Sequence, residues 1–191
     1  MKKGNLSEYF KGIACKRLST VEINPEISHQ HEFNGARQLK DFFGENKCHF
    51  SAKLIYLREG ENDPFTEDSE VTWYDARENH PTRSEYRLYY TGNLIKNNAS
   101  EGDLLIICKK TDYSLVIIIV QGDSTIENNL ICLFSLPEEG LGSTFAVKEI
   151  TGKNDQQIGF VSRLILAEIG IELSLTDDYY LDMMMREFGE K

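Results

Sequence analysis

The first 150 residues alternate short apolar stretches with polar connections. Most of these stretches have the two-residue period of half-buried strands, and Leu115 to Val120 is an unbroken apolar run of the length of one fully buried strand. We therefore expect strands at Cys48 to Leu57, Glu70 to Tyr74, Arg83 to Thr91, Asp103 to Lys109, Tyr113 to Val120 and Phe145 to Ile150. Because these strands follow one another without regular helical crossovers, the pattern predicts a mainly β fold of about seven strands, either an antiparallel sheet or a barrel.

Helical spacing is found in shorter segments. Ala36 to Phe43 places its apolar side chains on one side and ends before Gly44, which predicts a short helix packed on the core. Leu6 to Cys15 is expected to form a short helix or an irregular entry segment, and Ser124 to Leu133 fits neither a helix nor a strand well. Apolar residues recur at helical spacing in 155–170 and 176–188. We therefore expect one domain, residues 1–150, followed by a tail of C-terminal helices, residues 151–191.

Composition agrees with an ordinary soluble protein. The chain has 191 residues, of which 40% are apolar and 27% charged, and its longest apolar run is far too short for a membrane span. The start of the sequence has no apolar signal region, so we expect a cytoplasmic protein that does not bind a membrane. The four cysteines are widely spaced without a Cys-x-x-Cys pair, which favours reduced, mostly buried thiols over a zinc ribbon.

The formal charge of −10 argues against a nucleic-acid binder until it is divided along the chain. Residues 1–58 carry +4 and residues 81–100 carry +2, whereas residues 59–80 carry −7 and residues 101–191 carry −9. The first third and the stretch after residue 80 can therefore supply the local basic surface that DNA binding needs. Acidic groups elsewhere would orient a duplex by repulsion.

The central stretch from Trp73 to Gly92 contains the run of residues most suited to chemistry with DNA. If Arg83 to Thr91 is extended, Arg83, Glu85 and Arg87 lie on one face, because side chains alternate along a strand. An arginine fork fits guanine O6 and N7, and a carboxylate accepts from the cytosine amino group. The alternative is an exposed charge ladder that stabilises the strand slightly and recognises nothing.

Two further clusters are polar enough for DNA contacts, and the usual enzyme motifs are missing. Lys16 and Arg17 precede a hydroxyl pair and suit phosphate oxygens, although an ordinary solvated surface would look the same. His29 and His31 alternate in a polar loop, but without a third ligand at a suitable spacing they do not define a metal site. No phosphate-binding glycine loop, nucleophile elbow or zinc helix is present, and no strand carries the acidic-x-lysine pattern of metal-dependent nucleases.

Four motifs in order resemble the N-terminal effector domain of EcoRII-type restriction endonucleases. These are Lys16-Arg17-Leu18-Ser19, Ser28-His29-Gln30, Trp73-Tyr74-Asp75-Ala76-Arg77, and Thr82-Arg83-Ser84-Glu85-Tyr86-Arg87 with Gly92. The resemblance covers roughly residues 9–136. It implies a seven-stranded DNA-binding pseudobarrel, shared with plant B-three transcription factors, that grips the major groove of 5′-CCWGG with two arms. Here the N-arm would be Ser28 to Asn34 and the C-arm Pro81 to Arg87.

The resemblance also implies residue roles. The base-reading residues would be Arg83, Glu85, Arg87, Tyr86, His29, Gln30, His31 and Asn34, and the residues that contact the DNA backbone would be Lys16, Arg17, Arg77, Asn79, His80 and Thr82. Three positions depart from the family pattern. Tyr86 and Pro81 stand where the pattern has lysines, and Asn34 stands where it has a contacting tyrosine.

The function implied is that of a sequence-specific effector or target-recognition domain of a bacterial type II restriction endonuclease. We expect double-stranded DNA as partner, no cofactor for this domain, and magnesium only at a catalytic domain of the same polypeptide outside these 191 residues. The chain by itself would not cut DNA. Two alternatives stay open at this point: a stand-alone transcription regulator on the same barrel, and a protein-interaction scaffold whose methionine-rich tail binds a partner.

Overall fold

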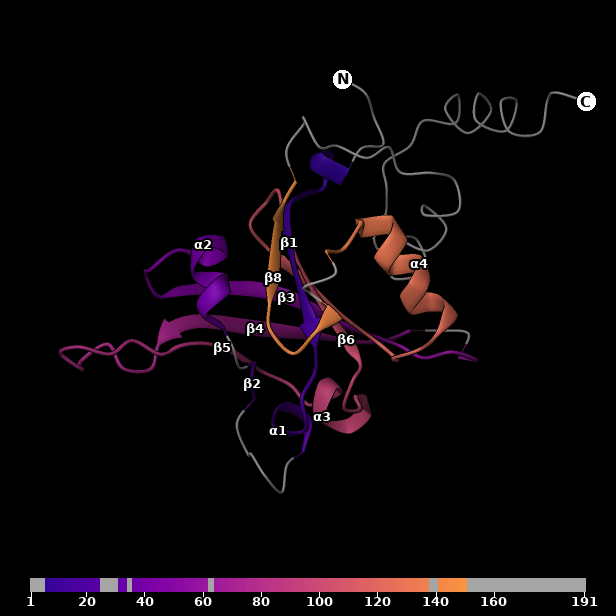
Figure 1. Ribbon diagram of the computed structural model, residues 1–191, viewed down its shortest axis with the longest axis horizontal. Coiled ribbons are helices and arrows are strands. Elements are labelled where there is room, and N and C mark those ends of the chain that lie inside the picture. Colours follow the sequence, from indigo (N-terminus) through magenta and orange to yellow (C-terminus); the bar gives the residue numbers. More distant parts are fainter. Residues whose placement is uncertain (1–5, 25–30, 34–35, 62–63, 138–140, 151–191) are drawn as a thin grey trace, which may run out of the picture.

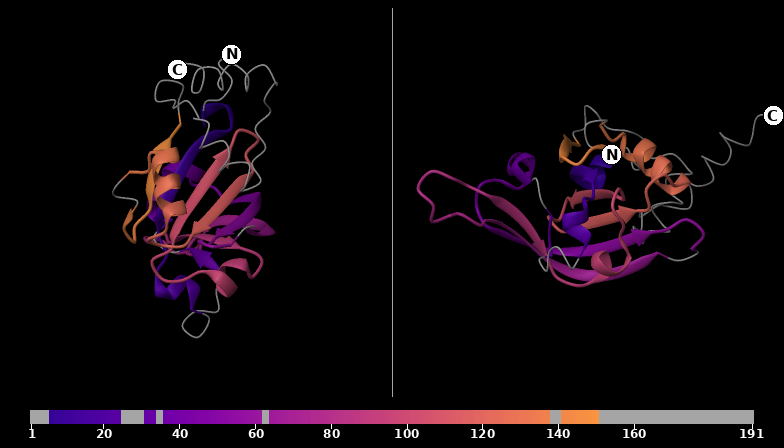
Figure 2. Two further views of the ribbon diagram at one scale, coloured as in Figure 1. Left: turned by 90° about the vertical axis from the view of Figure 1, so that its right-hand side faces the viewer. Right: turned by 60° about the horizontal axis from the view of Figure 1, so that its bottom comes forward.

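A computed structural model describes residues 6–24, 31–33, 36–61, 64–137 and 141–150. Within these ranges eight strands form one sheet in the order β2-β5-β4-β3-β7-β6-β1-β8 (Figure 1). Their bounds are β1 Phe10–Arg17, β2 Glu32–Phe33, β3 Cys48–Leu57, β4 Phe65–Asp75, β5 Tyr86–Tyr90, β6 Leu104–Lys110, β7 Leu115–Val120 and β8 Ala146–Glu149. Neighbouring strands are antiparallel except β3 and β7, which are parallel. The sheet curls into a half-barrel with β2 and β8 at its edges (Figure 2). The expected mainly β fold is confirmed, with eight described strands instead of about seven.

The helices of the described ranges are short. They are the 3-10 helices η1 Leu6–Glu8 and η2 Ala36–Leu39, and the α-helices α1 Thr20–Ile23, α2 Lys40–Phe43, α3 Leu94–Asn98 and α4 Thr125–Phe134. The helix expected at residues 36–43 is confirmed as η2 and α2. The ambiguous segment after Ser124 is α4, whose first turn is capped because the Ser124 hydroxyl oxygen accepts the Glu127 N–H at 3.1 Å. None of the described helices is long and apolar enough to cross a membrane.

One expectation about local structure was wrong: the segment from Leu6 to Cys15 is mostly strand β1. The segment after Asn93, for which the pattern predicted no element, contains α3. Strand β1 does not alternate apolar and polar residues, because nearly all of its side chains are buried, on both faces of the sheet. The tail expected at residues 151–191 lies outside the described residues.

The core has two layers, one on each face of the strands β6 and β7. The concave face packs Leu105, Ile107 and Ile117 against β3, β4, β5 and α3. The opposite face packs other side chains of β6 and β7 against α4 and the N-terminal segment, where the rings of Phe10 and Phe134 meet edge to face at 6.1 Å. All four cysteines are free; Cys15 and Cys108 are buried, Cys48 is half-buried and Cys132 is exposed.

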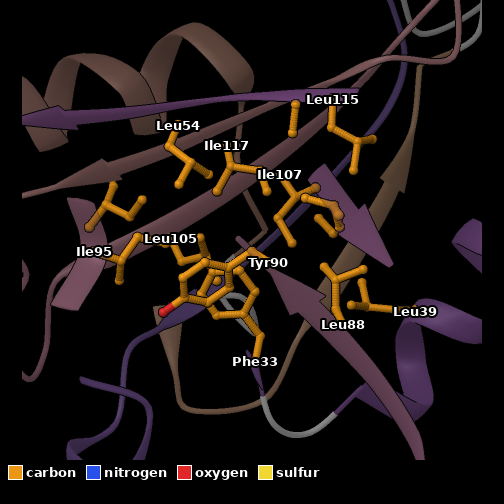
Figure 3. Packing of buried hydrophobic residues seen from close by; sticks show 14 of the residues in the cluster. Phe33, Leu39, Leu54, Leu88, Tyr90, Ile95, Leu105, Ile107, Leu115 and Ile117 are labelled. Carbon is orange, nitrogen blue, oxygen red and sulfur yellow. The ribbon is translucent and has the colours of Figure 1, made fainter. Parts of the chain in front are cut away.

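Strands β4 and β5 cover the concave core with one face only. Their inward side chains, among them Trp73, Leu88 and Tyr90, are fully buried, and the ring of Tyr90 stacks on that of Phe33 at 4.8 Å (Figure 3). Between these inward positions, Glu70 and Tyr89 are exposed. The outer face of this half of the sheet is therefore polar and open to solvent.

A buried ion pair fixes the segment that leads to β2. The Lys16 ammonium lies 2.6 Å from Glu22 Oε1, and neither side chain exposes more than 2% of its surface. Glu22 Oε2 accepts the backbone N–H and the hydroxyl of Ser19, at 2.9 and 2.7 Å, which ties α1 to the end of β1. This position corrects the expectation for Lys16, because a lysine that is buried and paired in this way does not reach a phosphate.

We predict that Lys16→Ala destabilises the fold and does not act on DNA binding directly. Removing one partner of a buried pair leaves the Glu22 carboxylate uncompensated, which costs about 3–5 kcal/mol of unfolding free energy. Urea denaturation followed by circular dichroism measures this. Lys47→Ala is the matched control, since Lys47 is exposed and its loss should change the unfolding free energy by less than about 0.5 kcal/mol. Equal effects of the two substitutions would contradict the structural role of Lys16.

Candidate nucleic-acid interface

The hairpin that joins β4 to β5 projects beyond the rest of the sheet (Figures 1 and 2). Its strands pair at Tyr74 with Arg87 and at Asp75 with Tyr86, and the pairing continues one step further because the Ala76 N–H donates to the Glu85 carbonyl at 2.8 Å. The loop between these residues is exposed to solvent over its whole length. This loop and the first two residues of β5 contain the C-arm, Pro81 to Arg87, that the sequence resemblance implies.

Two contacts hold the base of the hairpin in shape. Asp75 Oδ1 accepts the backbone N–H groups of Glu85 and Arg77, at 2.7 and 2.9 Å. On the core side, the ring of Tyr86 stacks on the buried ring of Trp73 at 4.9 Å with an angle of 17°. The short side chain of Asp75 therefore fixes the chain where it leaves β4, and the aromatic pair fixes it where β5 begins.

A chain of four charged groups runs across the outer face of the hairpin. Glu85 Oε1 accepts from Arg87 at 2.7 Å (Nη2) and 3.2 Å (Nε), and Glu85 Oε2 accepts from Arg77 Nε at 2.5 Å. Arg87 Nη1 also lies 2.6 Å from Glu32 Oε2, and the Tyr74 hydroxyl donates to Glu32 Oε1 at 2.5 Å. One carboxylate thus joins two guanidinium groups, and a second carboxylate joins the hairpin to β2.

The pKa shifts among these charged groups follow from their hydrogen-bond partners. Hydrogen bonds from Arg77 and then Arg87 hold the pKa of the Glu85 carboxyl below its ordinary value, because they favour the charged form. Burial, together with the bond to the Glu32 carboxylate, raises the pKa of the Tyr74 hydroxyl to about 12. Both arginines are charged and Glu85 is ionised at neutral pH.

The residues of the expected C-arm are arranged differently from a single extended strand. Strand β5 begins at Tyr86, and Arg83 lies in the exposed loop before it, without a hydrogen bond or ion pair to the described residues. The arginine that pairs with Glu85 from the other side is Arg77, which sequence analysis assigned to the DNA backbone. The row is therefore Arg77, Glu85, Arg87, and the expected row with Arg83 needs this correction.

Tyr86 also departs from its expected role. Its ring stacks on Trp73 and its hydroxyl donates to the Glu45 carbonyl at 3.3 Å, so the side chain packs on the body of the protein and does not face outward with Glu85 and Arg87. Asn79, His80 and Thr82 are exposed in the loop, where the His80 N–H donates to the Arg77 carbonyl at 2.7 Å. These three side chains are open to solvent, and their expected contact with the DNA backbone stays a prediction.

Only part of the expected N-arm can be placed. Ser28, His29, Gln30 and Asn34 lie outside the described residues, whereas His31, Glu32 and Phe33 are described. Glu32 pairs with Tyr89 and Phe33 with Leu88, so β2 lies beside β5. The half-buried ring of His31 stacks on that of Tyr90 at 5.4 Å. The described part of the N-arm thus adjoins the base of the hairpin.

Arg17 lies at the far end of the sheet. It aligns through Leu104 and Val120 with Leu57, the last residue of β3, whereas the hairpin leaves β4 next to the first residue of β3. Ten residues of strand separate these ends, about 30 Å. Arg17 also forms an ion pair with buried Glu127 and donates to the Gly102 carbonyl at 3.0 Å. The structure therefore does not bring Arg17 to the hairpin.

Other cations lie near the hairpin that sequence analysis did not single out. Lys40 of α2 lies 5.4 Å over the ring of Tyr86 and pairs with Glu45 at 2.6 Å, and exposed Lys47 immediately precedes β3, whose first residue pairs with Trp73. The only sequence signal for them is their position on the polar side of the short helix and just after it. From Asp75 to Arg87 the hairpin itself holds three acidic and three basic residues. Because the hairpin has no net charge, Lys40 and Lys47 would supply most of any attraction to phosphates.

Within the described ranges, no group of three or more histidine, cysteine, aspartate or glutamate side chains is placed to hold a metal ion. Two cavities elsewhere, of about 370 and 310 Å³, combine acidic and basic side chains; Lys109 and Asp41 line the first, and Arg58 and Asp103 the second. Neither of these two cavities contains a residue of the hairpin. The hairpin is the candidate site because it carries the glutamate paired with two arginines.

Among solved structures, the chain is similar to the N-terminal domain of Helicobacter pylori LlaJI.R1, with a TM-score of 0.44 and 11% sequence identity over 73% of this chain and 99% of that chain. No family model matches the sequence, and no curated protein matches it significantly. A structural likeness of this size carries no argument about function. The functional assignment therefore depends on the geometry of the hairpin.

We predict that Arg77 controls the titration of Glu85 and that Arg83 does not. In the wild-type protein the Glu85 side-chain carboxyl should titrate below the ordinary value of a glutamate, because both arginines favour its charged form. The ion pairs are then complete at neutral pH and are lost as the pH falls through that lowered pKa. Carbon-13 NMR of the carboxyl group measures the midpoint.

Arg77→Ala should move this midpoint upward, since the hydrogen bond that lowers the pKa of Glu85 most is lost. Arg83→Ala removes the same charge from the same loop and should leave the midpoint unchanged. A shift with Arg83→Ala and none with Arg77→Ala would restore the row that the sequence pattern indicates and refute the pairing in the structure.

Proposed function

We propose that this chain is a sequence-specific double-stranded DNA-binding module that serves as the effector or target-recognition domain of a type II restriction endonuclease. The observation that carries the proposal is the Glu85 carboxylate held between two guanidinium groups on a projecting hairpin. A hairpin of two antiparallel strands fits the major groove, which is about 12 Å wide. Arginine forks and a carboxylate on its outer face are the groups that recognise guanine and cytosine edges.

The arrangement of the charges supports recognition over general attraction. The hairpin is balanced in charge, and the whole chain is strongly acidic. Non-specific binding depends mainly on neutralised phosphates, so a surface of this kind binds random DNA weakly. Groups fixed by Asp75, Trp73 and Glu32 lose little conformational entropy on binding a base pair. The proposed interface is therefore the hairpin with β2 beside it, plus Lys40 and Lys47 at its base.

The recognised sequence proposed is 5′-CCWGG. This choice comes from the resemblance of the sequence motifs to EcoRII-type effector domains, and the row of arginine and glutamate suits the C:G pairs on both sides of the central pair. His31 and the residues 28–30 and 34 of the N-arm, and Arg83, Asn79, His80 and Thr82 of the loop, complete the proposed contacts. The partner domain would be a catalytic domain of the same polypeptide.

We predict that selection of bound duplexes from a random pool returns CCWGG, and that Glu85 is needed for the selectivity. Glu85→Ala should cost about 1–3 kcal/mol on the selected duplex, because the acceptor for the cytosine amino group is lost. On random duplex the same substitution should strengthen binding slightly, since it removes a negative charge. Fluorescence anisotropy on both duplexes measures the difference.

Two control variants separate recognition from electrostatics. Glu78→Ala removes one negative charge from the same loop at an exposed position and should strengthen binding to both duplexes alike. Lys47→Ala should weaken both alike and lower the slope of log K against log salt by about one. A selection that returned no motif, or one with only A:T pairs, would refute the proposal. So would a Glu85→Ala protein that behaved as Glu78→Ala does.

We also predict that the purified chain leaves DNA intact in the presence of magnesium. The metal-dependent nuclease pattern is an acidic residue followed, on a strand, by an acidic-x-lysine triplet, and no expected strand carries it. The one acidic-x-lysine triplet in the sequence is Glu45-Asn46-Lys47. It lies in the loop before β3, where Glu45 pairs with Lys40. Incubation of plasmid DNA containing CCWGG sites with the protein and Mg²⁺ tests this. Cleavage at any defined site, retained through repeated purification, would show that the chain is a nuclease by itself.

A further inference from the structure

The two arginines bound to Glu85 differ in how many of their donors are already used. All three nitrogens of Arg87 are engaged: Nε and Nη2 donate to Glu85, and Nη1 lies 2.6 Å from Glu32. Its side chain exposes 26% of its surface. One N–H remains on each terminal nitrogen of Arg87, so a guanine bound there would share the guanidinium with both carboxylates.

Arg77 is in the opposite situation. Only its Nε donates to Glu85, and its two terminal amino groups make no hydrogen bond with the described residues. Its side chain is 45% exposed. A guanidinium group whose Nε is occupied still presents Nη1 and Nη2 as a parallel pair of donors, which is the pair that a guanine O6 and N7 accept.

Glu85 has unused capacity on the same side. Its Oε1 accepts two hydrogen bonds, both from Arg87, whereas Oε2 accepts one, from Arg77. A carboxylate oxygen has two acceptor sites, so the remaining site of Oε2 lies next to the free edge of Arg77. Arg77 therefore offers a pair of donors for guanine, and Glu85 beside it offers an acceptor for the cytosine amino group, although the two residues are eight positions apart in the sequence.

Arg83, by contrast, is not held in place by a carboxylate of the described ranges. It is exposed and makes no hydrogen bond or ion pair with the described residues. Fixing such a long side chain on a base costs rotamer entropy, whereas the pair with Glu85 has already restricted Arg77. An exposed arginine on a projecting loop is suited to a phosphate, whose oxygens accept hydrogen bonds from many directions.

From these differences we infer that Arg77 and Glu85 together read one G:C pair, Arg77 through the guanine and Glu85 Oε2 through the cytosine amino group. Arg87 is then a positioning residue that holds Glu85 and ties the hairpin to β2, and Arg83 contacts the backbone. The inference rests on the proposed function, since it names the residues that give that site its selectivity. It exchanges the roles that sequence reasoning assigned to Arg77 and Arg83.

The test uses lysine substitutions, which keep the charge and remove the fork. Arg77→Lys should weaken binding to the selected duplex about 10- to 100-fold and leave binding to random duplex within about twofold, because only the bidentate guanine contact is lost. Selection with this variant should return a motif in which one G:C position has become tolerant of other base pairs. A purely structural role for Arg77 would weaken every position alike. The thermal unfolding midpoint of each variant, compared with wild type, excludes misfolding as the cause.

Two matched variants complete the experiment. Arg83→Lys should leave the selected motif unchanged. The affinity for the selected duplex should stay within about twofold of wild type. Glu32→Gln releases Arg87 from β2 and should weaken binding to the selected duplex more than binding to random duplex, because the hairpin and Glu85 are then held less firmly. If Arg83→Lys relaxed one position and Arg77→Lys did not, the inference would be wrong while the proposed function stood. If the wild-type protein selected no motif, both would fall.

Discussion

The projecting hairpin depends on the stagger between neighbouring strands of the sheet. Strand β7 begins at Leu115 opposite Ala52, so the first four residues of β3 pair with β4 alone. The hairpin of β4 and β5 then extends past Cys48, where β3 begins. Strand β3 thus passes the end of β7, and β4 and β5 pass the end of β3, a stagger typical of a curling sheet. The stagger brings Tyr74 and Arg87 to a place with solvent on one side and the Trp73 stack on the other.

Along the same sheet, burial changes from two faces to one. The outer face of β3 starts with exposed His49 and Ser51 and ends with buried Ile55 and Leu57 under the cluster that contains α4. The half next to β7 is therefore a stable, dry platform, and the other half is free to carry charge. The exposed pair of Arg77 and Glu85 on such a face adds little to stability, because solvent screens it. Its value lies in the fixed spacing of its donors and acceptors.

The location of cations matters more for this protein than their number. Lys16 and Arg17 are adjacent in the sequence, yet Lys16 is buried against Glu22 and Arg17 is neutralised by Glu127. Both stabilise connections of the scaffold: Lys16 holds α1 to the end of β1, and Arg17 joins β1 to the first turn of α4. Lys40 and Lys47, which lie in no recognisable motif, are the cations beside the hairpin. The acidic composition of the chain therefore coexists with local cations at the surface proposed to bind DNA.

The sequence by itself determined the mainly β class, most strands, the short helix at residues 36–43 and the alternation of outward Glu85 and Arg87 with inward Leu88, because each of these depends on local periodicity. It did not reveal β1, whose burial on both faces removes the period, nor β2, which is two residues long. Only the tertiary structure decided which arginine pairs with Glu85. Arg77 and Arg83 are both close in sequence, but the fold of the hairpin brings the carboxylate to Arg77 and leaves Arg83 in solvent. Which charges meet depends on the path of the backbone between them, and that path is fixed by long-range packing that no local pattern encodes.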